Sequence, residues 1–159
     1  MTAAQDRDLL LAAVAESRRS PPSDSAYSVG AIVVDAAGRE LARGHSREGD
    51  PHDHAEEVAL ARLARRAAAS PVTGPLTLYS SLEPCTRRRS RPVACAELVI
   101  TAGISRVVMA AREPDLFADC DGVEALTRAG VEVVELEKFA GLVRAVNAHL
   151  PAWCQASRR

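Results

Sequence analysis

The chain has 159 residues, of which 47% are hydrophobic, enough to bury the core of one globular domain spanning residues 1–159. A formal net charge of -1 argues against a general binder of polyanions, so no extended nucleic-acid surface is expected. No apolar run approaches the ~18 residues of a membrane span, and the charged start is unlike a signal peptide; we expect a cytoplasmic protein without a membrane partner. The four cysteines are expected to bind metal or stay free rather than to form a disulfide framework.

Hydrophobic periodicity divides the first half of the chain into a helix, a hairpin and a second helix. Leu10, Ala13 and Val14 recur at helical spacing, and residues 29–35 are apolar and β-branched. The pattern predicts, in order, a helix over 6–17, a loop over 18–25, hairpin strands over 29–35 and 40–45, a polar loop over 45–53 and an amphipathic helix over 54–69.

Strands and helices alternate in the second half of the chain. Gly103 and Gly130 each follow a helical pattern and are expected to end a helix. The pattern predicts strands over 76–80, 106–111 and 131–136, and helices over 95–102, 122–129 and 139–150. Alternating elements after an opening hairpin indicate a layered α/β sandwich with a mixed sheet.

One imidazole and two thiols stand at the ends of these predicted elements. His54 opens a helix, Cys85 follows a strand directly after Pro84, and Cys95 opens the next helix. One histidine and two cysteines can bind three sides of a tetrahedral Zn²⁺ and leave the fourth for water. Helix N-termini also favour the thiolate form that binds metal. His-x-Glu followed by Pro-Cys and a second cysteine is the signature of zinc-dependent deaminases.

Glu56, two residues after His54, is the candidate catalytic group. It can take a proton from the zinc-bound water and hand it to the ring and to the leaving amine, a role that needs a raised pKa. A simpler interpretation is that Asp53 and Glu56 form a capping box at the helix start. Taken singly, His54 would be an ordinary surface or core histidine and Cys85 a small buried hydrophobe; their co-occurrence favours the metal site.

Nine residues separate the two cysteines, and this spacer contains four arginines. Because both ends of the spacer are fixed at the predicted metal, it is expected to lie beside the pocket mouth. We hypothesise that Arg87, Arg88 and Arg89 hold a substrate phosphate by charge-assisted hydrogen bonds. A solvated loop is the alternative, since Lys138 is the only lysine and the whole chain is biased towards arginine.

The remaining histidine and cysteines near or beyond this region are assigned other roles. A ligand at His52 would put Glu56 four residues away rather than two, so His52 is interpreted as a loop residue and a candidate substrate contact. Cys120 and Cys154 have no partner at ligand spacing and are interpreted as structural. Trp153 lies in the polar tail, which gives no support to aromatic stacking of a substrate.

Four short motifs resemble the cytidine deaminase-like superfamily of zinc deaminases, over roughly residues 8–150. They are Ser28-Val29-Gly30-Ala31, Gly44-His45-Ser46-Arg47-Glu48, His54-Ala55-Glu56-Glu57 and Leu82-Glu83-Pro84-Cys85. Within the superfamily, the long cysteine spacer, the helix start Cys95-Ala96-Glu97 and Arg112-Glu113-Pro114-Asp115 are most similar to the pyrimidine deaminase domain of riboflavin biosynthesis.

The resemblance implies a five-stranded mixed sheet in a three-layer α/β/α sandwich. It implies His54, Cys85 and Cys95 as zinc ligands, Glu56 as the proton shuttle, and a homodimer or higher homo-oligomer. Ser28 stands where the family usually has asparagine, which is a departure from the family pattern. Ser28 and Ser81 are taken as candidate substrate contacts.

The expected function is hydrolytic deamination of an amino-substituted pyrimidine, of the phosphoribosylamino type found in the riboflavin pathway. The main alternative is a deaminase of cytidine, deoxycytidylate or another nucleobase or nucleoside in salvage or secondary metabolism. From a different class, the chain could be a zinc-stabilised binding module without catalysis; the presence of Glu56 disfavours this alternative.

Overall fold

A computed structural model describes residues 1–113 and 121–150 of the chain. Within these ranges the elements are α1 (Ala3–Ser17), β1 (Gly30–Val34), β2 (Glu40–His45), α2 (Ala55–Ala69), β3 (Thr77–Ser80), α3 (Cys95–Thr101), β4 (Arg106–Met109), α4 (Gly122–Arg128), β5 (Glu132–Glu135), a short 3₁₀ turn (Glu137–Phe139) and α5 (Ala140–Val146). Every predicted helix and strand is present. The residues Cys120, Trp153 and Cys154 lie outside the described residues.

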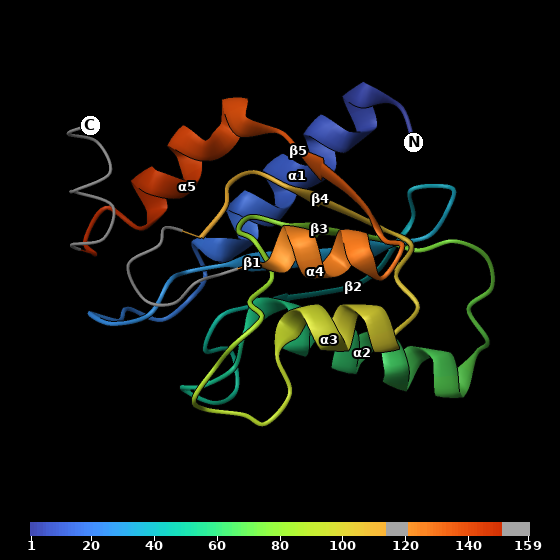
Figure 1. Ribbon diagram of the computed structural model, residues 1–159, viewed down its shortest axis with the longest axis horizontal. Helices are drawn as coiled ribbons and strands as arrows, with labels where there is room; N and C mark the ends of the chain where they lie inside the picture. The colour runs from blue at the N-terminus through green and yellow to red at the C-terminus, as the bar shows by residue number, and fades with distance from the viewer. Residues whose placement is uncertain (114–120, 151–159) are drawn as a thin grey trace.

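One mixed sheet organises the fold, with strand order β2-β1-β3-β4-β5. β1 pairs antiparallel with β2 and β3, whereas β3, β4 and β5 run parallel. Figure 1 shows α1 and α5 over one face of the sheet and α2 and α3 over the other, with α4 next to α3. The three-layer sandwich with a five-stranded mixed sheet is therefore confirmed.

Two glycines let the first two helices approach the sheet closely. A Cβ at Gly30 of β1 would lie 2.2 Å from the carbonyl oxygen of Ala13 in α1. A Cβ at Gly44 of β2 would lie 2.7 Å from Cβ of Val58 in α2. Neither position can hold a larger residue without moving the helix, because packed interiors have no spare volume of that size. β1 is thus buried between α1 and α2, and all five of its residues are buried.

Two helix ends differ by more than one residue from the boundaries that periodicity predicts. α1 begins at Ala3 rather than at residue 6 because Thr2 and Gln5 form a capping box that satisfies the first free N–H groups. α5 ends at Val146 rather than at residue 150. Asn147 follows the last residue of α5, and its side chain forms hydrogen bonds with the backbone of Ser28.

None of the helices in the described ranges is both long and apolar enough to cross a membrane. The C-terminal ends of β3 and β4 and the start of β1 lie together at one edge of the sheet, which is formed by strand ends and not by an outer strand. α2 and α3 also begin near this edge (Figure 1). The edge therefore gathers the chain segments that contain the predicted ligands.

Candidate metal centre and active site

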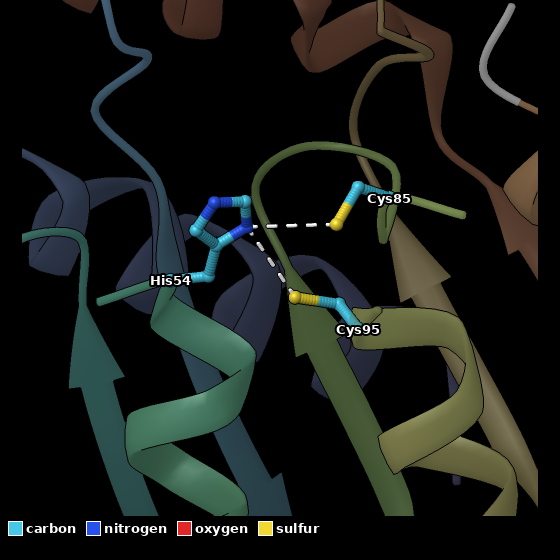
Figure 2. A group of neighbouring side chains, drawn as sticks. All are labelled: His54, Cys85 and Cys95. Carbon is cyan, nitrogen blue, oxygen red and sulfur yellow. Dashed lines mark hydrogen bonds between the residues drawn. The ribbon is translucent and has the colours of Figure 1, made fainter. Parts of the chain in front are cut away.

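His54, Cys85 and Cys95 come together at this edge although they lie far apart in the sequence. Figure 2 shows the imidazole facing both thiols, with His54 directly before α2 and Cys95 opening α3. Nδ1 of His54 lies 3.6 Å from Sγ of Cys85 and 3.4 Å from Sγ of Cys95. The three ligand atoms all lie within 4.8 Å of one another, and both cysteines are buried.

The spacing of these atoms fits a tetrahedral zinc ion. With Zn–S near 2.3 Å and Zn–N near 2.0 Å, a tetrahedral angle separates the sulfur and nitrogen by about 3.5 Å. The two nitrogen–sulfur distances, 3.6 and 3.4 Å, match that separation before any ion is placed. The donor set of one imidazole and two thiols is also the one that zinc prefers.

The thiols are polarised even in the metal-free protein. Hydrogen bonds from Cys95 and His54 lower the pKa of Cys85 to about 4 against the opposing effect of burial. The hydrogen bond to Cys85, together with burial, raises the pKa of Cys95. Burial lowers the pKa of His54, but the hydrogen bond and charge of Cys85 outweigh burial and raise it. The three groups therefore share their protons through direct contacts, and a divalent cation that binds them displaces those protons.

Glu56 is buried beside this cluster and does not cap the helix. His54 occupies the cap position of α2, and its N–H donates to the carboxylate of Glu57 at 3.4 Å, so the expected capping box of Asp53 and Glu56 is wrong. Glu56 Oε1 instead accepts a hydrogen bond from the Ser80 hydroxyl at 2.8 Å. Burial raises the pKa of Glu56, with the charges of His54 and Cys85 acting in opposite directions.

The two serines predicted to contact substrate are buried, and their polar atoms are held by other parts of the chain. Asn147 accepts the Ser28 N–H at 2.7 Å and donates to the Ser28 carbonyl at 3.2 Å. The Ser28 hydroxyl accepts a hydrogen bond from Arg47 at 3.0 Å. The Ser81 hydroxyl accepts the N–H of Gly30 at 3.1 Å. Both serines support the edge of the sheet at the site, and their contact with substrate stays a prediction.

The predicted phosphate contacts are divided between the surface and the interior. Arg87 and Arg89 are exposed. The side chain of Arg88 is only 3% exposed, and its Nη2 donates to the Glu57 carboxylate at 2.9 Å and to the His52 carbonyl at 2.9 Å. His52 is itself an exposed residue. Arg87, Arg89 and His52 remain candidate substrate contacts, whereas Arg88 is already engaged inside the protein.

Three polar residues at the site were missed from the sequence. Ser80 binds Glu56, and Glu57 binds both Arg88 and the His54 N–H. Glu83 is buried and accepts the backbone N–H groups of Glu113 and Val123. Burial raises the pKa of Glu83 although these two hydrogen bonds oppose the rise. Of these three residues, Ser80 could have been found from its position, because it ends a predicted strand that leads directly to Cys85.

A hollow of about 460 Å³ lies near Ser28, between the end of α1, the loop that follows it and α5. Polar residues such as Arg18, Ser20, Asp24 and His149 line it together with Pro22, Ala145 and Val146. None of the three metal-ligand candidates lines it. The hollow is therefore separate from the metal cluster, with Ser28 as the site residue that reaches it.

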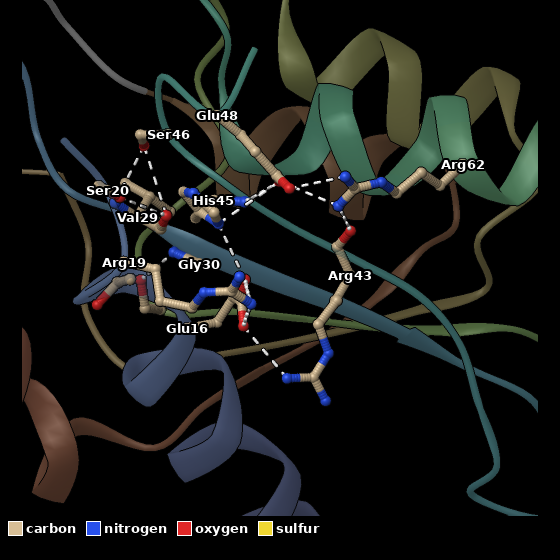
Figure 3. A network of polar contacts seen from close by, with 12 residues as sticks. Glu16, Arg19, Ser20, Val29, Gly30, Arg43, His45, Ser46, Glu48 and Arg62 are labelled. Carbon is tan, nitrogen blue, oxygen red and sulfur yellow. Dashed lines mark hydrogen bonds and ion pairs between the residues drawn. The ribbon is translucent and has the colours of Figure 1, made fainter.

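A network of polar side chains, separate from the candidate metal site, connects α1, β2 and α2 (Figure 3). Glu16 of α1 lies 2.9 Å from Nδ1 of His45 and 3.2 Å from Nη1 of Arg43. Glu48 lies 3.5 Å from the same His45 nitrogen and 2.7 Å from Nη2 of Arg62 in α2. Burial acts to raise the pKa of Glu16, but hydrogen bonds from His45 and Arg43 and the charges of Arg19 and Arg43 outweigh it and lower that pKa. The network therefore connects strand β2 to α1 on one face of the sheet and to α2 on the other.

The chain belongs to the cytidine and deoxycytidylate deaminase zinc-binding family. Residues 3–111, more than half of the chain, match the family model described as the cytidine and deoxycytidylate deaminase zinc-binding region. This match confirms the superfamily predicted from the four motifs. The cofactor of the family, zinc, is the ion that the cluster of His54, Cys85 and Cys95 fits.

Curated relatives narrow the resemblance to one branch. The diaminohydroxyphosphoribosylamino-pyrimidine deaminase of Schizosaccharomyces pombe is 36% identical over 146 residues, which cover 91% of this chain and 36% of that protein. The riboflavin biosynthesis protein RibD of Aquifex aeolicus is 39% identical over 107 residues, covering 67% of this chain and 27% of that protein. The chain thus spans about a third of the length of these relatives or less.

Solved structures give the same fold. The Aspergillus oryzae Rib2 deaminase in complex with DARIPP superposes with a TM-score of 0.81 at 22% identity, covering 95% of this chain and 94% of that chain. A Thermotoga maritima diaminohydroxyphosphoribosylaminopyrimidine deaminase/5-amino-6-(5-phosphoribosylamino)uracil reductase gives a TM-score of 0.78 at 26% identity, covering 90% of this chain and 39% of that one. These neighbours confirm the cytidine deaminase-like fold.

Proposed function

We propose that this chain is a zinc-dependent hydrolytic deaminase of an aminopyrimidine, releasing ammonia and leaving a ring carbonyl. The observation that carries the proposal is the cluster of His54, Cys85 and Cys95 with the buried carboxylate of Glu56 beside it. A buried acid next to an intact zinc ligand set is what deamination by water requires.

Each residue of the cluster has a distinct role in this proposal. His54, Cys85 and Cys95 would hold the zinc, which when bound would lower the pKa of a water and so supply a nucleophile at neutral pH. Glu56 would accept a proton from the attacking water and deliver it to the ring nitrogen and then to the leaving amine. The water oxygen becomes the ring carbonyl as the C–N bond breaks and ammonia departs. Ser80 holds the Glu56 carboxylate by its hydrogen bond.

The proposed substrate is a phosphoribosylamino-pyrimidine of the riboflavin pathway. The name and the 36% identity of the Schizosaccharomyces pombe relative support this branch. Arg87 and Arg89 are exposed on the spacer between the cysteines, where they can reach a phosphate. Replacing both with alanine is expected to raise KM for the phosphorylated substrate about tenfold or more and to leave KM for its dephosphorylated form unchanged. Equal KM values before and after replacement would remove this phosphate contact.

A deaminase of cytidine or deoxycytidylate is the second candidate, because the matching family model is described by these two substrates. Ammonia release by the zinc-loaded protein separates the candidates. The panel contains the riboflavin-pathway pyrimidine, cytosine, cytidine, deoxycytidylate, guanine and adenosine, with Glu56→Ala as the blank. Turnover of the riboflavin intermediate supports the first candidate, and turnover of cytidine or deoxycytidylate supports the second.

Silence across the panel from a protein that holds one zinc would contradict both deaminase assignments. It would favour the zinc-stabilised binding module. A homodimer or higher homo-oligomer and a cytoplasmic location also stay predictions. Light scattering during size-exclusion chromatography tests the first of these, and fractionation of the source cells tests the second.

A further inference from the structure

The spacer between the two cysteines is fastened to the start of α2 by a buried ion pair. Nη2 of Arg88 lies 2.9 Å from the carboxylate of Glu57, in the first turn of α2. The same nitrogen donates to the backbone carbonyl of His52 at 2.9 Å. One guanidinium group therefore bonds the chain on both sides of His54, two residues before it and three residues after it.

The Glu57 carboxylate completes this arrangement around His54. It accepts the backbone N–H of His54 at 3.4 Å while it binds Arg88. His54 is thus held through its own backbone by Glu57, and Glu57 is held by an arginine from the spacer. The two cysteines at the ends of that spacer and the histidine are joined by contacts that do not involve the ligand atoms themselves.

A second arginine of the spacer binds the same short stretch of chain. Arg91 lies 3.3 Å from the carboxylate of Asp53 and 3.4 Å from that of Glu57. The Asp53 carboxylate also accepts the backbone N–H groups of Gly49 and Asp50, at 3.1 and 2.8 Å. The loop before His54 and the spacer after Cys85 therefore share one network of ion pairs.

Burial distinguishes Arg88 from its neighbours. Its side chain is 3% exposed, whereas Arg87 and Arg89 are exposed residues of the same spacer. Its Nη1 has no hydrogen-bond partner in the described structure. A buried guanidinium with an unsatisfied N–H is a poor source of stability, because desolvation offsets much of the attraction. What the pair does fix is geometry, since it joins two segments that must meet at the metal.

We propose that Arg88, acting through Glu57 and the His52 carbonyl, is a positioning residue that holds His54 and the two cysteines in zinc-ligand geometry. The ligands belong to two segments, His54 on one and the Cys85-to-Cys95 spacer on the other, with 30 residues between His54 and Cys85. Without a link, ordering them against each other would reduce the free energy gained when zinc binds. The inference rests on the proposed zinc site but not on the deaminase reaction.

Zinc affinity tests this role without any need for turnover. Competition with a chromophoric chelator is expected to show that Arg88→Gln weakens zinc binding about tenfold or more, the usual size of effect for residues that orient metal ligands. Arg89→Gln removes the same charge from the same spacer but is exposed, so zinc affinity is expected to change less than twofold. Arg88→Lys keeps the charge and is expected to recover part of the loss.

A double-mutant cycle separates positioning from general damage to the fold. Glu57→Gln alone is expected to weaken zinc binding about as much as Arg88→Gln, and the double variant little more than either. Glu57→Gln also decides the matter if Arg88→Gln does not fold. Equal zinc affinities for Arg88→Gln and Arg89→Gln, or strictly additive losses in the cycle, would overturn the proposal. If the wild-type protein binds zinc but releases no ammonia from any substrate of the panel, the result would instead count against the proposed function.

Discussion

Two glutamates of this protein are equally shielded from solvent, and yet their pKa values are shifted in opposite directions. Glu16 and Glu56 are each 3% exposed. Around Glu16, the hydrogen bonds from His45 and Arg43 overcome burial and lower its pKa. Around Glu56, one hydroxyl group donates a hydrogen bond and burial raises its pKa. Low solvent exposure alone therefore does not set the direction of the pKa shift of a carboxyl group; its charged partners and its depth among other protein atoms do.

The contrast separates a structural carboxylate from the one proposed to transfer protons. Glu16 is a fixed negative charge that joins α1 to β2, as in Figure 3. Glu56 has neither an arginine nor a lysine among its hydrogen-bond partners in the described structure, so its proton can be exchanged during a reaction. Substitutions of Glu56, of Glu16 and of the Ser80 hydroxyl that contacts Glu56 test this contrast.

The largest effect is expected for Glu56→Gln. The amide has nearly the same shape and can keep a hydrogen bond with Ser80, but it cannot accept and return a proton. We expect kcat for ammonia release to fall about 1,000-fold, within the usual range for loss of a general acid–base group. Zinc content, measured by metal analysis, and the unfolding midpoint are expected to stay at the wild-type values. Activity within tenfold of wild type would assign proton transfer to another group.

The reverse pattern is expected for Glu16→Gln. Removing this charge leaves His45 and Arg43 without their shared partner inside the protein. We expect the free energy of unfolding to fall by about 2 kcal/mol, as is typical when a buried charged hydrogen bond is broken. Urea unfolding monitored by circular dichroism measures this change. A loss similar to that of Arg39→Gln, which removes an exposed guanidinium from its ion pair with Asp35, would show that the Glu16 contacts add no more than one solvent-facing arginine does.

Ser80→Ala tests how far one hydroxyl orients the reactive carboxylate. The substitution removes the hydrogen bond that another side chain donates to the Glu56 carboxylate and leaves the one from the Glu56 backbone N–H. We expect kcat to fall about tenfold, because a carboxylate that is free to rotate is less well aligned for proton transfer. Ser105→Ala, which removes a hydroxyl bonded to the Leu76 carbonyl near the opposite ends of the strands, is the matched control. Equal rates for both variants would contradict the orienting role.

The smallest effect is a pH dependence of stability that belongs to Glu16. Because its folded pKa lies below the ordinary value of 4.5, its stabilising contribution is present above that value and is lost as the pH falls through the lowered pKa. The difference in unfolding free energy between wild type and Glu16→Gln should therefore be constant at neutral pH and shrink in acid. Other carboxylates, such as Asp6, titrate in both proteins and cancel. A difference that grows in acid would contradict the lowered pKa.

Local sequence patterns were sufficient for the secondary structure and for the three side chains that the fold brings together as candidate metal ligands. Strand and helix periodicity depends on neighbouring residues, so β1 and α2 could be located before their packing was known. His54, Cys85 and Cys95 were identified because zinc accepts few donor types and their positions at element ends are rare. The alternative capping box of Asp53 and Glu56 fails because the Asp53 carboxylate accepts the N–H groups of Gly49 and Asp50 and the Glu56 carboxylate binds Ser80, contacts that the local pattern does not contain.

The environment of each buried charge was decided by the tertiary structure alone. Ser80 meets Glu56 across 24 residues, Arg88 meets Glu57 across 31 and Asn147 meets Ser28 across 119. No periodicity links such positions, because their distances depend on how the strands pair and how the helices pack on the sheet. For the same reason the sequence presented four equivalent spacer arginines, and only the fold buries Arg88 and leaves Arg87 and Arg89 in solvent. The sequence determined which chemistry is present, and packing determined which groups can carry it out.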